Sequence, residues 1–257
     1  MKSARRYSTE ALVIRQLDYA EADRILTIYT PGRGKFSVIA KGVRRARSRR
    51  SGHLDLFTRV RLDLAAARNL DVVTQADAIE RFLFLGEDVT ALTYAHYCAE
   101  ILDAFVPESN HPSSELYAAT LETLRRLGRR ERDIAVRAFE MLLLDRSGYR
   151  PQLHSCLGCG KEIVPEKNYF SPALGGVICG DCMYQDPASV EISVPALKIL
   201  RNLQTRPQEV LRLNRVEAAL QGEMERRLHD YVVYHLERRP KSSRVLESLR
   251  TAPAIPA

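Results

Sequence analysis

Residues 156–159 read Cys-Leu-Gly-Cys and residues 179–182 read Cys-Gly-Asp-Cys, so nineteen residues separate two C-x-x-C knuckles. This spacing predicts one zinc site, because two intervening residues let both sulfurs of a knuckle reach a single tetrahedral ion. The ligands are Cys156, Cys159, Cys179 and Cys182. Four sulfurs fill the coordination shell, which indicates a structural Zn²⁺ rather than a catalytic one. An iron–sulfur cluster or a redox pair is the alternative, and His154 is expected to be a bystander.

The rest of the sequence indicates a cytoplasmic protein. No apolar run of its 257 residues approaches the ~18 of a membrane span, and the stretch Ala11–Ile14 is too short for a signal peptide. Cytosolic thiols stay reduced, so five cysteines favour metal binding over disulfides. The fifth, Cys98, lies among apolar neighbours and is expected to be a small buried residue.

Positive charge is concentrated in the first third of the chain. Residues 1–81 hold seventeen Lys or Arg against nine Asp or Glu, whereas the remainder holds twenty-two against twenty-three. No acid occurs between Asp23 and Asp55, and this asymmetry predicts a polyanionic partner. A solvated, disordered loop or a nuclear-localisation-like patch is the alternative for this basic run. The candidate nucleic-acid-binding residues are Arg33, Lys35, Lys41, Arg44, Arg45, Arg47, Arg49 and Arg50.

Residues 1–82 are expected to form five strands. Runs at 11–17, 24–30, 36–43, 54–64 and 69–76 are β-branched or alternate with period two, and Pro-Gly-Arg-Gly at 31–34 is typical of a turn. The pattern fits an OB-fold barrel that binds nucleic acid, and an SH3-like barrel would look similar. Four aromatic residues are candidate base-stacking platforms, although each is more readily explained as barrel core. They are Tyr19, Tyr29, Phe36 and Phe57.

From residue 87 the apolar period becomes 3.6, which predicts helices. A helical domain is expected at 83–152 and 188–246, with a four-cysteine zinc-binding element inserted at 153–187 and a flexible tail at 247–257. Within the insertion, Gly175-Gly176 between two apolar pairs suggests a small hairpin. The expected class is therefore an α+β multidomain protein.

The chain contains no P-loop, no H-E-x-x-H, no G-x-S-x-G and no Rossmann glycine pattern. This absence weighs against an enzyme. Two rivals are a zinc-containing nucleic-acid-modifying enzyme and a zinc-ribbon transcription regulator. The near-neutral zinc segment is poorly equipped for phosphate contact, which weighs against the second rival.

The sequence resembles the RecO family of bacterial recombination mediators over most of its length. The barrel carries Asp23-Arg24-Ile25-Leu26 and Ala40-Lys41-Gly42-Val43-Arg44, and later come Gly148-Tyr149-Arg150-Pro151 and Phe170-Ser171-Pro172. The resemblance continues through the first knuckle and ends with Pro240-Lys241-Ser242-Ser243-Arg244. Some members of this family lack the cysteines.

The resemblance implies a DNA repair and recombination role without catalysis, at the nucleoid. It implies binding of single- and double-stranded DNA, strand annealing, action with RecR and often RecF, and loading of RecA onto strands covered by single-strand binding protein. The acidic C-terminal tail of that protein would need an apolar pocket rimmed by cations. No membrane or small-molecule substrate is expected. Possible rim residues are Lys198, Arg201, Arg238, Arg239 and Lys241.

Overall fold

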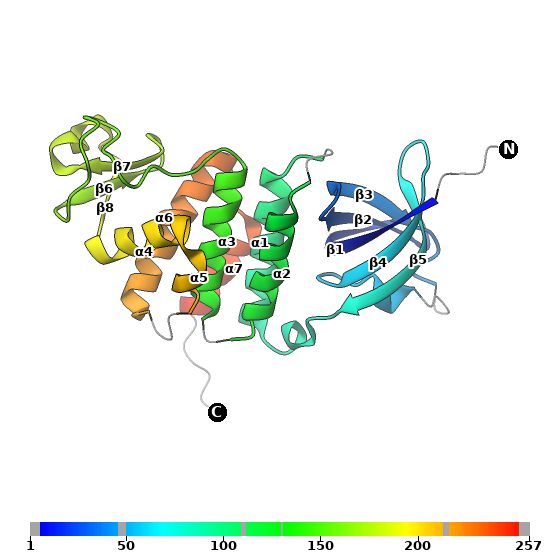
Figure 1. Ribbon diagram of the computed structural model, residues 1–257. Helices are drawn as coiled ribbons and strands as arrows, with labels where there is room; N and C mark the ends of the chain where they lie inside the picture. The colour runs from blue at the N-terminus through cyan, green and yellow to red at the C-terminus, as the bar shows by residue number, and fades with distance from the viewer. Residues whose placement is uncertain (1–5, 46–49, 109–111, 130, 213–215, 252–257) are drawn as a thin grey trace, which may run out of the picture.

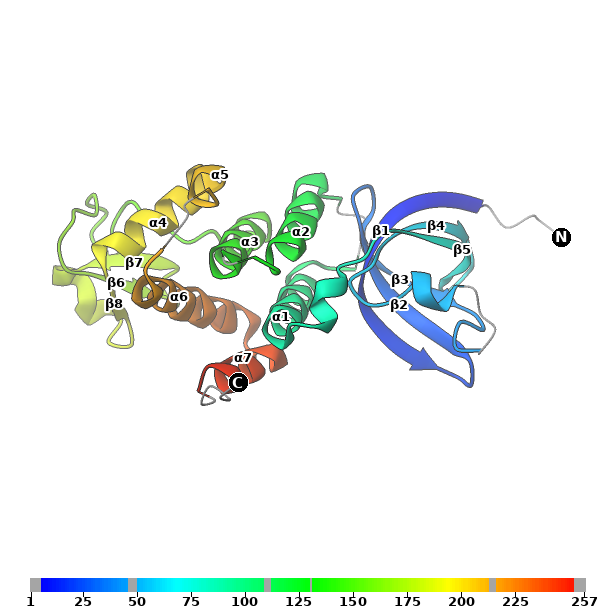
Figure 2. The ribbon, with the colours of Figure 1, turned by 90° about the horizontal axis from the view of Figure 1, so that it is seen from below.

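A β-barrel lies at one end of the molecule, a row of helices in the middle and a small three-stranded sheet at the other end (Figures 1 and 2). This computed structural model describes residues 6–45, 50–108, 112–129, 131–212 and 216–251. None of the described helices is both long enough and apolar enough to span a membrane. The helices therefore separate the two features that stand out in the sequence, the basic segment and the cysteine knuckles.

The barrel closes in the order β1-β2-β3-β5-β4, with β4 returning to β1. Its neighbours are antiparallel except β3 and β5, which pair in parallel over two residues. This confirms the OB-like barrel. Alternating apolar side chains such as Val13, Leu26 and Val38 fill its interior. The strands are β1 (Arg6–Tyr19), β2 (Asp23–Thr30), β3 (Gly34–Ala40), β4 (Arg59–Ala65) and β5 (Asp71–Glu80).

The fourth strand begins later than its alternating pattern predicts. A short 3-10 helix, η1 (Ser51–His53), precedes it, and the chain then turns through Phe57, whose φ is +61°. Leu54 still reaches the barrel interior, so its apolar character reflects burial rather than strand structure. Period-two patterning therefore located the buried residues but not the beginning of the strand.

One outer side of the barrel is covered by helices. Leu12 and Ile14, two residues apart on β1, both point outward into the core shared with the helical part, and a bulge between Val13 and Arg15 then shifts the register of the strand. Tyr29 and Phe57 join that core, with the Tyr29 ring 6.0 Å from the ring of Tyr117. The barrel is thus firmly attached to the helices, and only its remaining outer surface is open to a ligand.

The helical part is built around α3, which contacts α1, α2, α4 and α6. Asp88, Ser113 and Ser193 cap α1, α2 and α4 through their side-chain oxygens. A short 3-10 helix, η2 (Leu83–Gly86), links the barrel to the first α-helix. The helices are α1 (Val89–Phe105), α2 (Ser114–Arg126), α3 (Arg132–Arg146), α4 (Val194–Thr205), α5 (Pro207–Val210), α6 (Ala218–Leu236) and α7 (Lys241–Thr251).

The C-terminal segment 247–257, for which the sequence predicts a flexible tail, is partly helical. Residues 247–251 continue α7, and residues 252–257 lie outside the described part of the chain. Two long-range contacts explain the helix: Leu246 is buried in the main core, and the carboxylate of Glu100 on α1 accepts hydrogen bonds from the first backbone N–H groups of α7. Neither contact is visible in the local sequence.

Candidate nucleic-acid surface and metal site

The candidate DNA-binding residues do not form one patch. Arg33 and Lys35 lie at the start of β3, and Lys41, Arg44 and Arg45 follow its end. Seven residues of extended strand separate these ends by about 20 Å. Arg47 and Arg49 lie outside the described residues. The structure therefore divides the set into two locations with different surroundings.

The turn after β3 presents the exposed cations. Lys41, Arg44 and Arg45 are all exposed, and the Arg44 guanidinium lies 3.5 Å from Asp18. Two bonds hold the turn against the tip of the β1–β2 hairpin: Gly42 N–H donates to Asp23 at 2.7 Å, and Arg44 N–H donates to a backbone carbonyl at 3.0 Å. Because its φ is +66°, position 42 favours glycine. We call these three exposed cations the cationic turn.

Arg50 has a positioning role within this region. Its guanidinium donates to the carbonyl oxygens of Lys41 and Val73, at 2.8 and 2.7 Å. It thus ties the end of β3 to β5. A phosphate contact by Arg50 would compete with both bonds, so we do not include it in the cationic turn.

Arg33 and Lys35 are engaged within the protein. The ammonium of Lys35 is buried and bonds to the Asp103 carboxylate of α1 at 2.8 Å, so this residue is not available to phosphates and leaves the candidate set. The Arg33 guanidinium lies over the Phe36 ring, 4.3 Å from its centre, and 3.6 Å from Asp71. Arg33 is partly exposed, but its guanidinium also donates to the Tyr7 hydroxyl, so a carboxylate, a ring and a hydroxyl of the protein already hold it.

Only one of the four candidate aromatic platforms lies open to solvent. Tyr29 and Phe57 are buried between barrel and helices, and Phe36 packs against the barrel interior. Tyr19 is 52% exposed at the end of β1. It lies across from Asp23 on β2, which holds the cationic turn in place. A base-stacking group and three cations therefore lie at the same end of the barrel.

The outer face of β1–β3 continues from this point as an apolar surface. Leu17 is 53% exposed and pairs with Ile25, which in turn pairs with Ile39. Side chains two residues apart on a strand share a face, so Leu17 and Tyr19 lie on the same side of β1. Exposed apolar and aromatic groups beside cations suit the bases and the phosphates of a single strand, respectively.

The four knuckle cysteines come together at the far end of the molecule. Their sulfur atoms all lie within 4.8 Å of one another, with Cys156 and Cys159 3.7 and 3.9 Å from Cys179. Tetrahedral coordination with Zn–S bonds of about 2.3 Å requires sulfurs about 3.8 Å apart, so these thiols could hold such an ion. No other Cys, His, Asp or Glu of the described residues joins the group, and His154 is not part of it.

Local structure builds this cluster. The strands β6 (Asn168–Ser171), β7 (Gly176–Cys179) and β8 (Val190–Ile192) form one sheet, which confirms the hairpin, and the 3-10 helix η3 (Gly180–Gln185) carries Cys182. A Cβ at Gly158 would lie 2.9 Å from the Cys182 sulfur, so only glycine fits there. Although burial alone would raise it, backbone N–H donors lower the pKa of the Cys156 thiol to about 6, which favours the metal-binding thiolate.

A buried arginine in the helical part was not found from the sequence. The Arg137 side chain on α3 is 4% exposed, its Nε lies 3.0 Å from Glu140, and its Nη1 has no hydrogen-bond partner. It contributes to a cavity of about 610 Å³ between α3, α6 and α7, which we call the Arg137 cavity. Val233 and Leu246 supply apolar wall. Arg137 is one of three arginines in α3, and no local pattern distinguishes it from the other two.

The five candidate rim cations have different locations. Arg239 lines the Arg137 cavity, whereas Arg238 and Lys241 line a separate cavity beside the barrel. The Arg201 guanidinium donates to the carbonyl oxygens of Leu153 and Ile163, which attaches the cysteine-bearing element to α4. Lys198 is exposed on α4 and lines neither of these cavities.

Comparison with known proteins covers nearly the whole chain. A family model described as Recombination protein O N terminal matches residues 1–82, and one described as Recombination protein O C terminal matches residues 86–244. The DNA repair protein RecO of Roseiflexus sp. (strain RS-1) is 41% identical over 245 residues, which cover 95% of this chain and 86% of the relative. The RecO of Desulforudis audaxviator is 38% identical, covering 95% and 98%, and that of Symbiobacterium thermophilum is 35% identical, covering 96% and 98%.

Proposed function

This chain belongs to the RecO family of DNA repair proteins, and from that premise we propose that it is a non-enzymatic recombination mediator of the cytoplasm. It binds single- and double-stranded DNA and anneals complementary strands. With RecR, it helps to load RecA onto strands covered by single-strand binding protein. Rival functions as a nucleic-acid-modifying enzyme or a transcription regulator have no comparable support from its relatives.

The observation that carries this proposal is the cationic turn beside exposed Tyr19. Lys41, Arg44 and Arg45 contact phosphates without reading sequence, because phosphates are the same at every base. Tyr19 and Leu17 offer a surface to unpaired bases. Annealing then needs no chemical step: the cations reduce repulsion between two strands and leave the base edges free to pair.

The triple variant Lys41→Gln, Arg44→Gln, Arg45→Gln is expected to bind DNA more weakly and with a flatter salt dependence. Loss of three phosphate contacts should reduce the slope of log K against log salt by about 2 on single strands, at about 0.7 per contact. Fluorescence anisotropy with labelled oligonucleotides over a salt series measures both quantities. Arg50 is left unchanged because its loss would loosen the turn itself.

A matched control removes the same charge from the far end of the molecule. The triple variant Lys161→Gln, Lys167→Gln, Lys198→Gln changes three exposed lysines on or near the cysteine-bearing element. It should keep the wild-type slope and annealing rate. Equal slopes for both triple variants would contradict the proposal, strand scission or base release by the wild type would favour an enzyme, and strong preference for one duplex sequence would favour a regulator.

We further propose that the cysteine cluster holds one structural Zn²⁺. Four thiolates are the donor set that zinc prefers in closed sites, and the sulfur spacing matches its bond length. The cluster lies beyond the helices from the barrel (Figure 1), so zinc supports folding of this end and takes no part in phosphate contacts. Metal analysis of the purified protein tests whether the bound ion is zinc.

For the acidic tail of single-strand binding protein we propose the Arg137 cavity. A carboxylate in this cavity would lie close to the Arg137 guanidinium, whose buried Nη1 has no hydrogen-bond partner, and beside an apolar wall that includes Leu246. Arg239 lies at the rim, paired with Glu247. Acidic side chains also line this cavity, so the proposal depends on the buried guanidinium rather than on net charge.

Neighbouring arginines provide a direct comparison. Arg239→Gln is expected to weaken binding of an acidic tail peptide about fivefold, the effect of one partly exposed ion pair. Arg238→Gln removes the same charge one residue away, but outside the Arg137 cavity, and should leave the affinity unchanged. Calorimetric titration of the peptide into each variant measures the two affinities. A larger loss for the Arg238 variant would place the tail elsewhere.

A further inference from the structure

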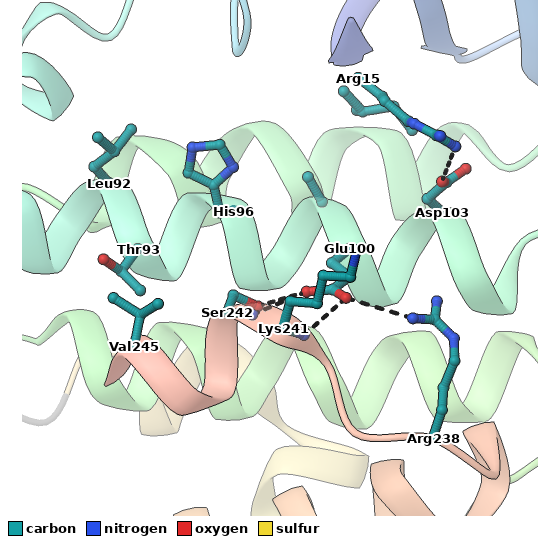
Figure 3. Close-up of a pocket in the computed structure, with 12 residues that line it drawn as sticks. Arg15, Leu92, Thr93, His96, Glu100, Asp103, Arg238, Lys241, Ser242 and Val245 are labelled. Atoms are coloured by element: carbon teal, nitrogen blue, oxygen red, sulfur yellow. Dashed lines mark hydrogen bonds and ion pairs between the residues drawn. The ribbon is translucent and has the colours of Figure 1, made fainter. Parts of the chain in front are cut away.

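A separate cavity of about 560 Å³ lies where the barrel meets α1 and α7 (Figure 3). Arg15 enters it from β1, His96 from α1 and Lys241 from the start of α7. We call it the junction cavity. Its volume is in the range of sites that hold small molecules or single groups of a larger ligand.

The junction cavity combines an apolar wall with cations at its rim. Ile14, Leu92 and Val245 supply apolar surface, and Arg15 and Arg238 are 62% and 52% exposed. No described residue forms an ion pair with the Lys241 ammonium. This composition suits a ligand with one flat apolar group and a negatively charged backbone.

The two acids of the cavity are already engaged by the protein. Glu100 accepts hydrogen bonds from the backbone N–H groups of Lys241 and Ser242, at 2.9 and 3.1 Å, and so caps α7 (Figure 3). Asp103 accepts a hydrogen bond from the buried ammonium of Lys35 at 2.8 Å, and its carboxylate lies 3.6 Å from the Arg15 guanidinium. These contacts largely neutralise both carboxylates, so they do not repel an anion as free acids would.

His96 gives the cavity an aromatic ring. Burial lowers the pKa of its imidazole, against a smaller upward effect of Glu100, so the ring is neutral at pH 7. Its other neighbour is the Phe57 ring, which it meets at an angle of 80° with the ring centres 5.1 Å apart. A neutral ring held in this way can stack on a base, because every base presents a π-face.

The junction cavity is continuous with the outer face of the barrel. Arg15 belongs to the outward row of β1 that continues through Leu17 to Tyr19, the residue beside the cationic turn. Four residues of extended strand separate Arg15 and Tyr19, a distance of about 13 Å. One strand of DNA could therefore extend from the cationic turn to the cavity along a single side of β1.

We propose that the junction cavity binds one nucleotide of a DNA single strand, with its base against His96 and the apolar wall and its phosphates near Arg15 and Lys241. This inference rests on the proposed function, and it adds α7 to the DNA-binding surface. A base must leave its stack to enter a cavity, which costs more free energy in a duplex than in a single strand. The cavity therefore favours single strands over duplexes.

Two variants of the full-length protein test the charge and the space separately. Arg15→Gln with Lys241→Gln should lower affinity for a labelled oligo(dT) about tenfold and reduce the salt slope by about 1.4. Val245→Trp, which fills the cavity without changing charge, should lower affinity for oligo(dT) with little change in slope. Neither should alter affinity for a duplex of the same length. Lys161→Gln with Lys198→Gln, which removes two distant charges, should bind like the wild type.

The possible outcomes separate this inference from the function on which it depends. Wild-type oligo(dT) affinity in both cavity variants, alongside loss in the cationic-turn variant, overturns the inference and leaves the function intact. Equal loss on oligo(dT) and duplex also overturns it, because the cavity then supplies phosphate contacts alone. Loss of acidic-peptide binding without loss of DNA binding would assign the cavity to a protein partner. A wild type that ignores DNA would contradict the proposed function itself.

Discussion

If the cysteine cluster holds Zn²⁺ as we propose, removal of the metal should unfold residues 151–192 while the barrel stays folded. The three strands of this element contain only four, four and three residues, too few for a stable sheet without another constraint. Structural zinc contributes about 10–16 kcal/mol to the folding of small zinc-binding peptides, and here it would add to the burial of Phe170, Val177 and Ile192 in the main core. The barrel interior is a core of its own, in addition to the core that the barrel shares with the helices, so the barrel should stay folded.

Hydrogen exchange measured by mass spectrometry tests this expectation. A chelator, or the double variant Cys159→Ser, Cys179→Ser, should abolish protection at 151–192 and weaken it in α4, which Arg201 links to the element. Protection in the barrel and affinity for DNA should persist. Cys98→Ala removes a buried thiol outside the cluster and should keep one zinc per chain. Unchanged protection at 151–192 in zinc-free protein would show that the cluster does not support the fold.

Features encoded by local spacing could be predicted from the sequence. The knuckles, the hairpin at Gly175-Gly176 and the barrel strands follow from turn residues and short periods, which act over a few positions. The family could also be identified, because its motifs are distributed along the chain. Exposure of Lys41, Arg44 and Arg45 agrees with an acid-free run, although Asp18 of the neighbouring hairpin lies 3.5 Å from Arg44.

Features that depend on distant partners could not be predicted. In the sequence Lys35 looks like a surface cation, but in the fold its buried ammonium bonds to Asp103, sixty-eight residues later. Tyr29 and Phe57 are buried as expected, but outside the barrel, because the helices pack on that face. The helix α7 needs its cap from Glu100, more than a hundred residues earlier. The sequence shows where cations are concentrated, whereas the fold determines which of them are exposed and which are paired or buried.

Glu140→Ala should destabilise the protein more than any other single substitution considered. Glu140 is completely buried and pairs with Arg137, and it accepts the Tyr97 hydroxyl at 2.6 Å. Removing the carboxylate leaves a guanidinium buried without that partner, which costs about 3–5 kcal/mol. Tyr97→Phe removes only a hydrogen bond and should cost about 1 kcal/mol. Urea unfolding measures the loss in free energy of unfolding for each variant. A smaller loss for Glu140→Ala than for Tyr97→Phe would show that Glu140 does not stabilise Arg137.

The double variant Glu140→Leu, Arg137→Met separates stability from partner binding. An apolar pair of similar volume often replaces a buried ion pair with little cost, so much of the lost free energy of unfolding should return. If the guanidinium only supports the fold, the double variant should bind an acidic tail peptide like the wild type. If its unpartnered Nη1 receives a carboxylate, as we propose, the refolded variant should fail to bind the peptide. Recovery of both stability and binding would therefore exclude Arg137 as the anion-binding group.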